Sequence, residues 1–245
     1  MLTIGIVGGM GPMATVDLFA KIIKSTPAST DQEHLKIIVY DNPQIPSRID
    51  AIIKHTESPL NELISSAQLL EKAGAEVLVM ACNTAHFWHQ DIQKAVHVKL
   101  INMIENTADY IKAHQLEGNG KFMLFATAAT VKTELYQKAF LAKKLVVLSP
   151  SIEEQKIVSL AIEGAKAGKL ADNGKIKLLT EIISQYQQKG VNSFIAGCTE
   201  IPLLFPYIIG NYQLIDPTAI LAQTVVKQAM QDNMKEPIKI DKVSA

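Results

Sequence analysis

Short apolar runs alternate with longer amphipathic segments along nearly the whole chain. Runs rich in β-branched residues predict strands within residues 3–9, 35–41, 76–82, 99–104, 121–127, 144–150 and 192–198. Several of these runs are apolar at almost every position, which is typical of parallel strands covered on both faces. Segment 58–74 has the helical pattern instead, with Ser58 as the expected N-cap, Pro59 in the first turn and Gly74 at the stop. The alternation predicts an α/β fold with mainly parallel sheets flanked by helices.

A polar, glycine-bearing segment at residues 115–121 divides this pattern near its middle. Each side has its own strands and helices, and each has one strand that ends in a cysteine. We therefore expect two pseudo-symmetric α/β domains, residues 1–115 and 116–210, with the active site in the cleft between them. In the C-terminal segment, residues 211–231, a short strand at 212–216 is expected to precede a final helix, and this helix is expected to pack back on the first domain. Residues 232–245 are expected to form a tail.

Composition narrows the class of protein. The chain has 245 residues, of which 48% are hydrophobic, so it can bury a sizeable core. Its formal net charge is zero, which gives no support to a nucleic-acid or acidic-membrane partner. The N-terminal segment has no basic region, and no stretch approaches the roughly 18 apolar residues of a spanning helix. We expect a cytoplasmic protein whose thiols stay reduced.

The two cysteines lie in similar turns. Cys82 stands in "MACNTAH" (80–86) and Cys198 in "IAGCTEI" (195–201), each at the end of a predicted strand. Ligands of open α/β sheets bind at the carboxyl ends of the strands. The residues after each cysteine are expected to open a helix, whose amides and dipole favour a thiolate. We therefore expect the pKa of each thiol to lie below the ordinary value of about 8.5.

Several chemistries compete for this cysteine pair. Two ordinary buried cysteines would show the same apolar context, although the matching turns weaken that interpretation. Nothing suggests secretion and hence a disulfide, and the ligand spacings typical of a metal site are absent. A single nucleophilic Cys82 with His86 or His89 as partner leaves the second turn unexplained. Inversion of a carbon centre requires acid and base groups on opposite faces, which two thiols can supply.

Four stretches make the sequence similar to the pyridoxal-phosphate-independent aspartate/glutamate racemase superfamily, most of all to its aspartate racemase branch. They are "GIVGGMGPMAT" (5–15), "QEHLKIIVYDNPQIPSRID" (32–50), "GAEVLVMACNTAH" (74–86) and "IAGCTEIPLL" (195–204), and they span nearly the whole chain. The resemblance implies two pseudo-symmetric α/β domains, a substrate held between them, no cofactor and usually a homodimer. One departure is that Ala128 and Ala129 stand where family members commonly carry an acidic or polar residue and a glycine.

The resemblance also implies a set of site residues. Cys82 and Cys198 are the expected catalytic pair. A planar guanidinium suits bidentate binding of a carboxylate, so Arg48 is expected to hold one carboxylate and Lys166 a second. The full set of expected substrate-binding residues is Met10, Gly11, Arg48, Asn83, Thr84, Thr130, Lys166 and Thr199.

Other interpretations of these residues stay open at this point. Asn and Thr at strand ends also cap helices. The glycine-rich turn after the first strand matches G-x-G-x-x-A, a weak dinucleotide fingerprint, but the second predicted strand ends without the free acidic residue that would bind a ribose. His86 and Glu200 are candidate auxiliary residues without an assigned role. No metal is expected.

The sequence thus favours a cofactor-independent racemase that interconverts L- and D-aspartate, or glutamate, by two-base proton transfer between Cys82 and Cys198. One alternative is a maleate-isomerase-like enzyme that acts on a small dicarboxylate with one cysteine as nucleophile. Another is a non-catalytic dicarboxylate-binding sensor, for which neither thiol would be needed. The expected partner is a small acidic amino acid, with a second copy of the chain in a homodimer.

Overall fold

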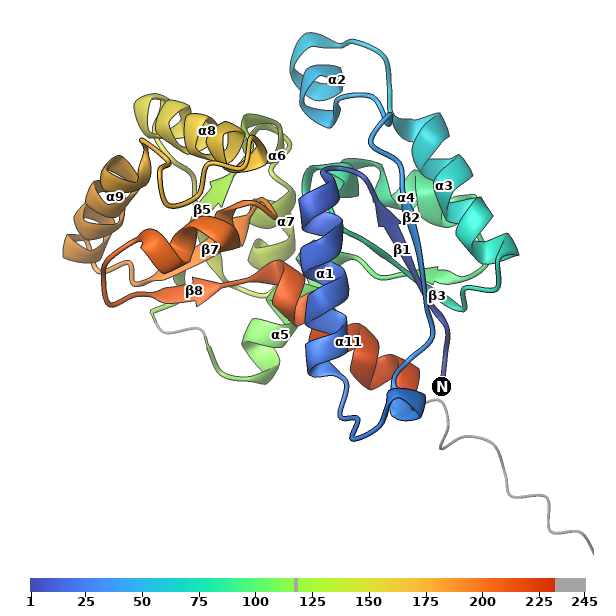
Figure 1. Ribbon diagram of the computed structural model, residues 1–245. Helices are drawn as coiled ribbons and strands as arrows, with labels where there is room; N and C mark the ends of the chain where they lie inside the picture. Colours follow the sequence, from blue (N-terminus) through green and yellow to red (C-terminus); the bar gives the residue numbers. More distant parts are fainter. Residues whose placement is uncertain (117–118, 232–245) are drawn as a thin grey trace, which may run out of the picture.

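The computed structural model describes residues 1–116 and 119–231, so the predicted tail at 232–245 lies outside the described residues. Two parallel four-stranded sheets form the framework, in the orders β2-β1-β3-β4 and β6-β5-β7-β8 (Figure 1). The strands are β1 (Ile4–Gly8), β2 (Ile37–Asp41), β3 (Val77–Met80), β4 (Lys99–Leu100), β5 (Lys121–Ala126), β6 (Val146–Leu148), β7 (Ser193–Gly197) and β8 (Gln213–Ile215). The two sheets share one topology, which confirms the predicted two-part α/β fold.

Helices cover both faces of each sheet. The α-helices are α1 (Pro12–Ser25), α2 (Arg48–Lys54), α3 (Leu60–Lys72), α4 (His89–Lys94), α5 (Met103–Ala113), α6 (Ala128–Lys132), α7 (Leu135–Leu141), α8 (Ile152–Lys166), α9 (Ile176–Gln188), α10 (Ile201–Leu204) and α11 (Pro217–Gln231). The short 3-10 helices are η1 (Asp31–Glu33), η2 (Thr84–Trp88) and η3 (Phe205–Tyr207). On the first sheet α1 and α11 pack opposite α3 and α4, and on the second sheet α8 and α9 pack opposite α5 and α7. The central strands β1, β3, β5 and β7 are therefore buried at nearly every position, as the continuous apolar runs predicted, whereas the edge strands β2 and β6 stay partly exposed.

Each run of residues predicted as a strand contains one, but in the run at 99–104 only Lys99 and Leu100 are strand, and Met103 and Ile104 already belong to α5. The strand β4 ends at Leu100 because Asn102 begins α5: its side-chain oxygen accepts hydrogen bonds from the amides of Ile104, at 3.0 Å, and Glu105, at 3.2 Å. An N-cap of this kind satisfies amides that the first helical turn leaves free. Apolar residues that resemble a strand in sequence thus become the first turn of a helix.

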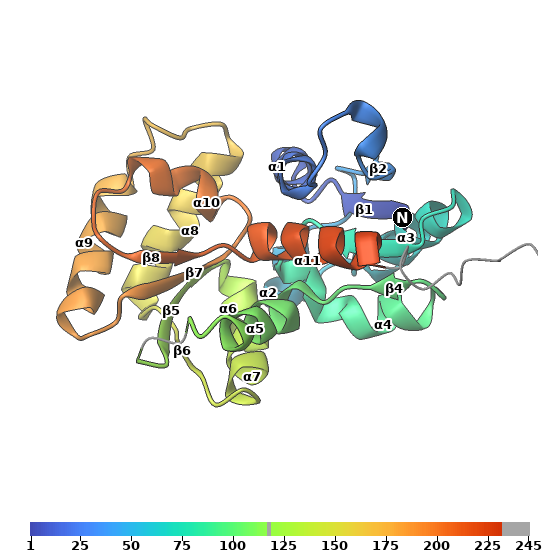
Figure 2. The same ribbon diagram turned by 90° about the horizontal axis from the view of Figure 1, so that it is seen from below.

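The last helix of each half packs on the sheet of the other half. In α5, residues Ile104, Ala108 and Ile111 belong to an apolar cluster with Phe122 and Leu124 of β5. In α11, residues from Leu221 to Ala229 belong to a second cluster that includes Ile4 and Ile6 of β1. Figure 2 shows α11 running from the second half across to the side of β1. This helix exchange ties the two halves together.

The predicted boundary at residue 115 follows α5, a helix whose apolar residues pack on the second sheet. At the C-terminal end, residues 213–215 form β8, which pairs with β7 and lies within the strand predicted at 212–216. The return to the first sheet therefore begins at Pro217.

None of the helices in residues 1–116 and 119–231 is long and apolar enough to cross a membrane.

Candidate active site

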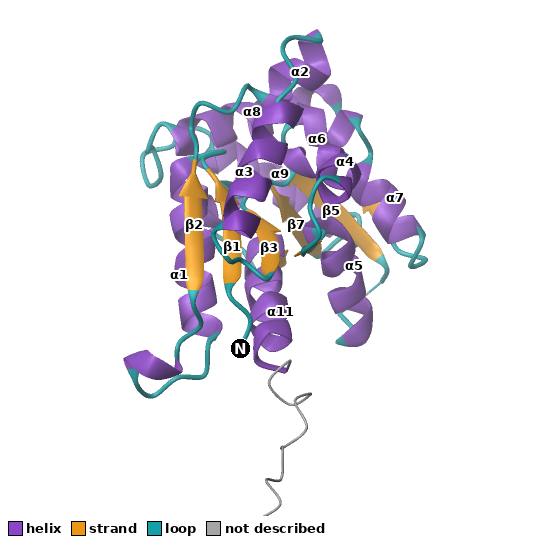
Figure 3. Ribbon diagram, turned by 90° about the vertical axis from the view of Figure 1, so that its right-hand side faces the viewer, coloured by secondary structure: helices purple, strands orange, loops and turns teal. Residues whose placement is uncertain are grey.

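The carboxyl ends of the central strands meet around one narrow cavity of about 50 Å³. Loops that follow β1, β3, β5 and β7 reach it, and the ends of α2 and α8 lie over it; Figure 3 shows α2 beyond the carboxyl end of β2. The cavity is lined by Met10, Ser47, Arg48, Ile49, Cys82, Asn83, Thr84, Thr127, Lys166, Cys198, Thr199 and Glu200. Both thiols thus face one space, at equivalent strand ends of the two halves.

A second cavity, of about 600 Å³, lies beside α5 and α7. It is larger, but neither cysteine lines it, and its wall includes His86, Phe87 and an ion pair between Lys143 and Asp109. The chemistry therefore points to the smaller cavity.

The expected site residues separate into two groups. Those that line the small cavity are Met10, Arg48, Cys82, Asn83, Thr84, Lys166, Cys198, Thr199 and Glu200. Gly11, Thr130 and His86 do not line it: Gly11 precedes α1, Thr130 is fully buried in α6, and His86 lies behind the Cys82 turn. Among the residues that line the cavity but were not predicted, Thr127 had a usable signal, since it is the last residue of the predicted strand 121–127, as each cysteine is of its own run.

The environment of Cys198 is dominated by Glu200. The thiol donates a hydrogen bond to Glu200 Oε2 at 2.9 Å, and the Thr199 hydroxyl donates to the same oxygen at 3.1 Å. Burial raises the pKa of Cys198 well above its ordinary value, and the charge of Glu200 acts in the same direction. The charge of Lys166 opposes this effect but is the smaller influence. Cys198 is therefore held as a thiol.

This result corrects the expectation that the Cys198 thiol is unusually acidic. The helix that follows it, α10, has only four residues, so it has few aligned peptide dipoles to stabilise a thiolate. A buried carboxylate two positions away outweighs that small contribution.

The turn at Cys82 is held by hydrogen bonds of His86, whereas the turn at Cys198 contains the carboxylate of Glu200. The Cys82 turn continues into the five-residue 3-10 helix η2, and its backbone is anchored by His86. The amide of Met103 donates to His86 Nε2 at 3.0 Å, so Nε2 is the acceptor and Nδ1–H donates to the Cys82 carbonyl at 2.8 Å. With both ring nitrogens occupied, His86 fixes the turn rather than contacting a thiol.

His86 also makes stability depend on pH. Burial lowers the pKa of His86 to about 4, from an ordinary value of about 6.5 in the unfolded chain. Between these two pH values, His86 is protonated in the unfolded chain but neutral in the folded chain. The contribution of the neutral His86 to folding stability is therefore complete above about pH 6.5 and is lost as the pH falls through 4. The difference between the folded and unfolded pKa values of His86 corresponds to about 3 kcal/mol in the free energy of unfolding.

Urea unfolding at pH 7 and at about pH 4 is expected to reveal this linkage. The free energy of unfolding of the native chain should fall by about 3 kcal/mol more than that of His86→Gln, which has no titrating ring. His55→Asn is the matched control, because His55 is exposed at the end of α2 and its replacement should leave the native dependence unchanged. Equal pH dependence in the native and His86→Gln proteins would contradict a neutral, buried His86.

Two N–H donors at the cavity have no partner. Arg48, the first residue of α2, donates through Nη1 to the carbonyls of Ile45 and Pro46, both at 3.0 Å, and through Nη2 to that of Met10 at 3.4 Å, but its Nε is buried and unpaired. The Nδ2 amide of Asn83 is likewise buried without a partner. Unpaired buried donors are rare in folded proteins. With Lys166 nearby, they make the cavity suited to an anion.

This arrangement differs from the expected bidentate grip of Arg48 on a carboxylate. Its two terminal nitrogens are already engaged by backbone carbonyls, and Nε is the guanidinium nitrogen that is buried without a partner.

Three threonine hydroxyls join the two halves beside the cavity. Thr84 is 2.9 Å from both Thr127 and Thr130, and the last two are 3.0 Å apart. Thr127 also caps α6, accepting from the Thr130 amide at 3.2 Å. Thr130, which was expected to bind substrate, therefore lies behind the cavity wall. The neighbouring residues Ala128 and Ala129 do not line the cavity either.

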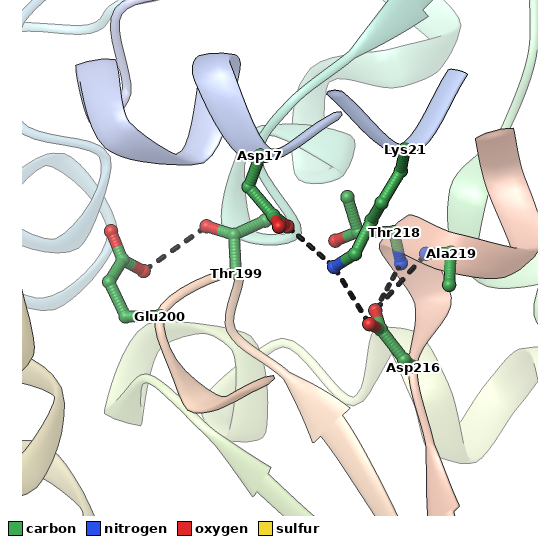
Figure 4. A network of polar contacts seen from close by, with 7 residues as sticks. All are labelled: Asp17, Lys21, Thr199, Glu200, Asp216, Thr218 and Ala219. Carbon is green, nitrogen blue, oxygen red and sulfur yellow. Dashed lines mark hydrogen bonds and ion pairs between the residues drawn. The ribbon is translucent and has the colours of Figure 1, made fainter. Parts of the chain in front are cut away.

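A second polar network connects α1 to the start of α11 (Figure 4). Lys21 Nζ contacts Asp17 at 2.5 Å and Asp216 at 2.8 Å. Burial lowers the pKa of Lys21, but the charge of Asp216 and hydrogen bonds to both carboxylates outweigh it and raise the pKa overall. Figure 4 places Thr199 between Glu200 and Asp17. The two ion pairs thus join α1 to the start of α11.

Within residues 1–116 and 119–231, no group of three or more His, Cys, Asp and Glu side chains is arranged to hold a metal ion.

Known proteins share this fold and this arrangement of strands. A family model described as Asp/Glu/Hydantoin racemase matches residues 7–225. The chain is 30% identical to an aspartate racemase of Picrophilus torridus, with a TM-score of 0.81 and coverage of 94% of this chain and 95% of that one. It is 28% identical over 228 residues to a broad specificity amino-acid racemase of Bacillus subtilis (strain 168), covering 91% of this chain and 96% of the relative. A glutamate racemase of Francisella tularensis shares the fold, with a TM-score of 0.70 at 18% identity and coverage of 97% of this chain and 84% of that one.

The chain therefore belongs to the Asp/Glu/Hydantoin racemase family. Its similarity to racemases over nearly its full length makes it an enzyme of the isomerase class, an amino-acid racemase.

Proposed function

We propose that the chain interconverts L- and D-aspartate, or glutamate, without a cofactor, using Cys82 and Cys198 as the two acid/base groups. The observation that carries the proposal is the cavity itself. Both thiols, one from each half, line it together with the unpaired donors of Arg48 and Asn83. A substrate bound between the halves would present its α-carbon to one thiol on each face.

Proton transfer follows from the different settings of the two thiols. With one enantiomer, the Cys82 thiolate removes the α-proton and the Cys198 thiol delivers its proton to the opposite face. The product then leaves Cys82 protonated and Cys198 deprotonated. With the other enantiomer the roles reverse: it binds to the form in which Cys82 is protonated and Cys198 is deprotonated, the Cys198 thiolate removes the α-proton, and the Cys82 thiol delivers its proton to the opposite face. Glu200, which is hydrogen-bonded to the Cys198 thiol, can take up the Cys198 proton when the two enzyme forms interconvert by exchange with solvent.

The difficult requirement is the weak acidity of the α-proton. As that proton leaves, negative charge develops on the α-carboxylate, and preorganised N–H donors stabilise it most effectively where water is excluded. The Asn83 amide and Arg48 Nε are buried donors at the cavity, and Lys166 adds a positive charge. These groups take the part that an imine cofactor plays in other racemases.

The preference for an acidic substrate rests on charge. Arg48 on α2 and Lys166 on α8 belong to different halves, so they offer separate cations for two carboxylates. A neutral amino acid would pair with only one of these two cations and would lose the second charge-assisted contact. As expected from the sequence, the proposal also includes two domains at residues 1–115 and 116–210. It further includes a cytoplasmic location and a homodimer.

Incubation of the purified protein with single L-amino acids, without added cofactor, tests the proposal by chiral chromatography. D-aspartate or D-glutamate should appear and approach a racemic mixture, and neutral amino acids should react at least about tenfold more slowly, as judged by kcat/KM. Turnover of maleate with no amino acid racemised would contradict the proposal in favour of a dicarboxylate isomerase. Tight dicarboxylate binding without any turnover would favour a sensor.

A further inference from the structure

Tyr136 lies beneath both cysteine turns. It belongs to α7 and is fully buried. Its hydroxyl donates to Asn83 Oδ1, the residue after Cys82, at 2.5 Å. Its ring packs against Gly197, the residue before Cys198, so closely that a Cβ on Gly197 would stand 3.3 Å from Tyr136 Cε2. One side chain therefore contacts both the residue that follows Cys82 and the residue that precedes Cys198.

The hydrogen bond decides which end of the Asn83 amide is available. A planar amide has an accepting oxygen at one end and a donating nitrogen at the other. Because Tyr136 occupies Oδ1, the nitrogen Nδ2 is left buried and unpaired at the cavity that Asn83 lines. The reverse orientation would present an oxygen to the cavity, which would repel a carboxylate.

Tyr136 remains a donor under ordinary conditions. Burial raises its pKa well above the usual value of 10, and the charges of Asp216 and Cys198 act in the same direction. The phenol therefore keeps its proton while the enzyme works.

We propose that Tyr136 is a positioning residue that presents the Asn83 amide as a hydrogen-bond donor to the α-carboxylate of the substrate. It does not touch the reacting atoms but acts through Asn83. The inference rests on the proposed racemase function and deepens it, because it assigns the origin of one of the donors that stabilise the developing charge.

The variant Tyr136→Phe tests this, since it removes the hydroxyl and keeps the ring against Gly197. We expect kcat/KM for aspartate to fall at least about tenfold in both directions, with circular dichroism unchanged. The matched control is Tyr186→Phe: Tyr186 lies in α9 of the same half and donates to Glu154 at 3.1 Å, away from the cavity. That variant should keep native kinetics. Native kinetics in Tyr136→Phe would overturn the inference.

A double-mutant cycle separates positioning from a general loss of structure. If Tyr136 acts through Asn83, Tyr136→Phe should change kcat/KM by less than about twofold once Asn83 is already alanine. Independent, multiplicative losses in the double variant would overturn the inference, because they would place the action of Tyr136 elsewhere.

Succinate binding keeps this test separate from the test of racemase activity. If the native chain racemised no amino acid, the proposed function would fail, and calorimetry with succinate would decide the role of Tyr136. A dissociation constant at least about tenfold weaker in Tyr136→Phe supports the positioning of Asn83 toward a carboxylate. Equal affinities, or no binding by the native chain, would overturn it.

Discussion

Replacement of either Cys82 or Cys198 by alanine is expected to reduce racemisation by at least about a thousandfold in both directions, since general acid–base catalysis commonly contributes 10²–10⁴-fold. Each thiol is the base for one enantiomer and the acid for the other, so by microscopic reversibility neither direction survives the loss of one. Chiral chromatography from each enantiomer, with circular dichroism as the check on folding, measures the effect.

Isotope incorporation sharpens this prediction. In deuterated water at early times, the native enzyme should give product that carries solvent deuterium while the recovered substrate remains mostly unlabelled. The reason is that the proton taken by one thiol is not the proton delivered by the other. Racemisation near the native rate in either alanine variant would eliminate the two-thiol mechanism, and equal labelling of substrate and product would favour a single base.

The variant Glu200→Gln is expected to lower kcat/KM by about a hundredfold. The glutamine side chain would still accept a hydrogen bond from the Cys198 thiol, but it cannot take up the thiol proton. Because the equilibrium constant of racemisation is one, the losses in the two directions must be equal. Loss of the negative charge should also lower the pKa of Cys198, which moves the alkaline limb of the pH profile to lower pH.

The control for Glu200→Gln is Glu163→Gln, at an exposed position of α8, which should keep native activity. A loss of less than about threefold in Glu200→Gln would show that the carboxylate only neighbours the thiol and does not accept its proton.

The framework of the fold was predictable because its strands are covered on both faces. Such strands are apolar at nearly every position, so β1, β3, β5 and β7 stand out in the sequence. The return of α11 to the first half was an expectation from the sequence, but the placement of α5 on the second sheet was not, since an amphipathic pattern shows that a helix has an apolar face but not which sheet covers it. Local capping by Asn102 likewise decided the end of β4 against the apolar pattern.

The site was predictable in position more than in electrostatics. The strand-end rule placed both cysteines at one cavity with their polar neighbours. The pKa of Cys198 depends instead on the length of α10 and on the direction in which Glu200 turns, and neither is encoded in a local pattern. In the same way, the engagement of Arg48 with the carbonyls of Ile45, Pro46 and Met10 depends on how distant loops meet.

The crossed placement of α5 and α11 has a consequence for how the molecule comes apart. Each sheet depends on a helix supplied by the other half to cover one of its apolar faces. If either half unfolds, the helix that it packs on the other sheet is lost. One apolar face of that sheet is then exposed to water, at a free-energy cost that grows with the apolar area exposed. The halves therefore denature together in one cooperative transition, and a fragment that ends at the midpoint of the chain lacks part of its own core.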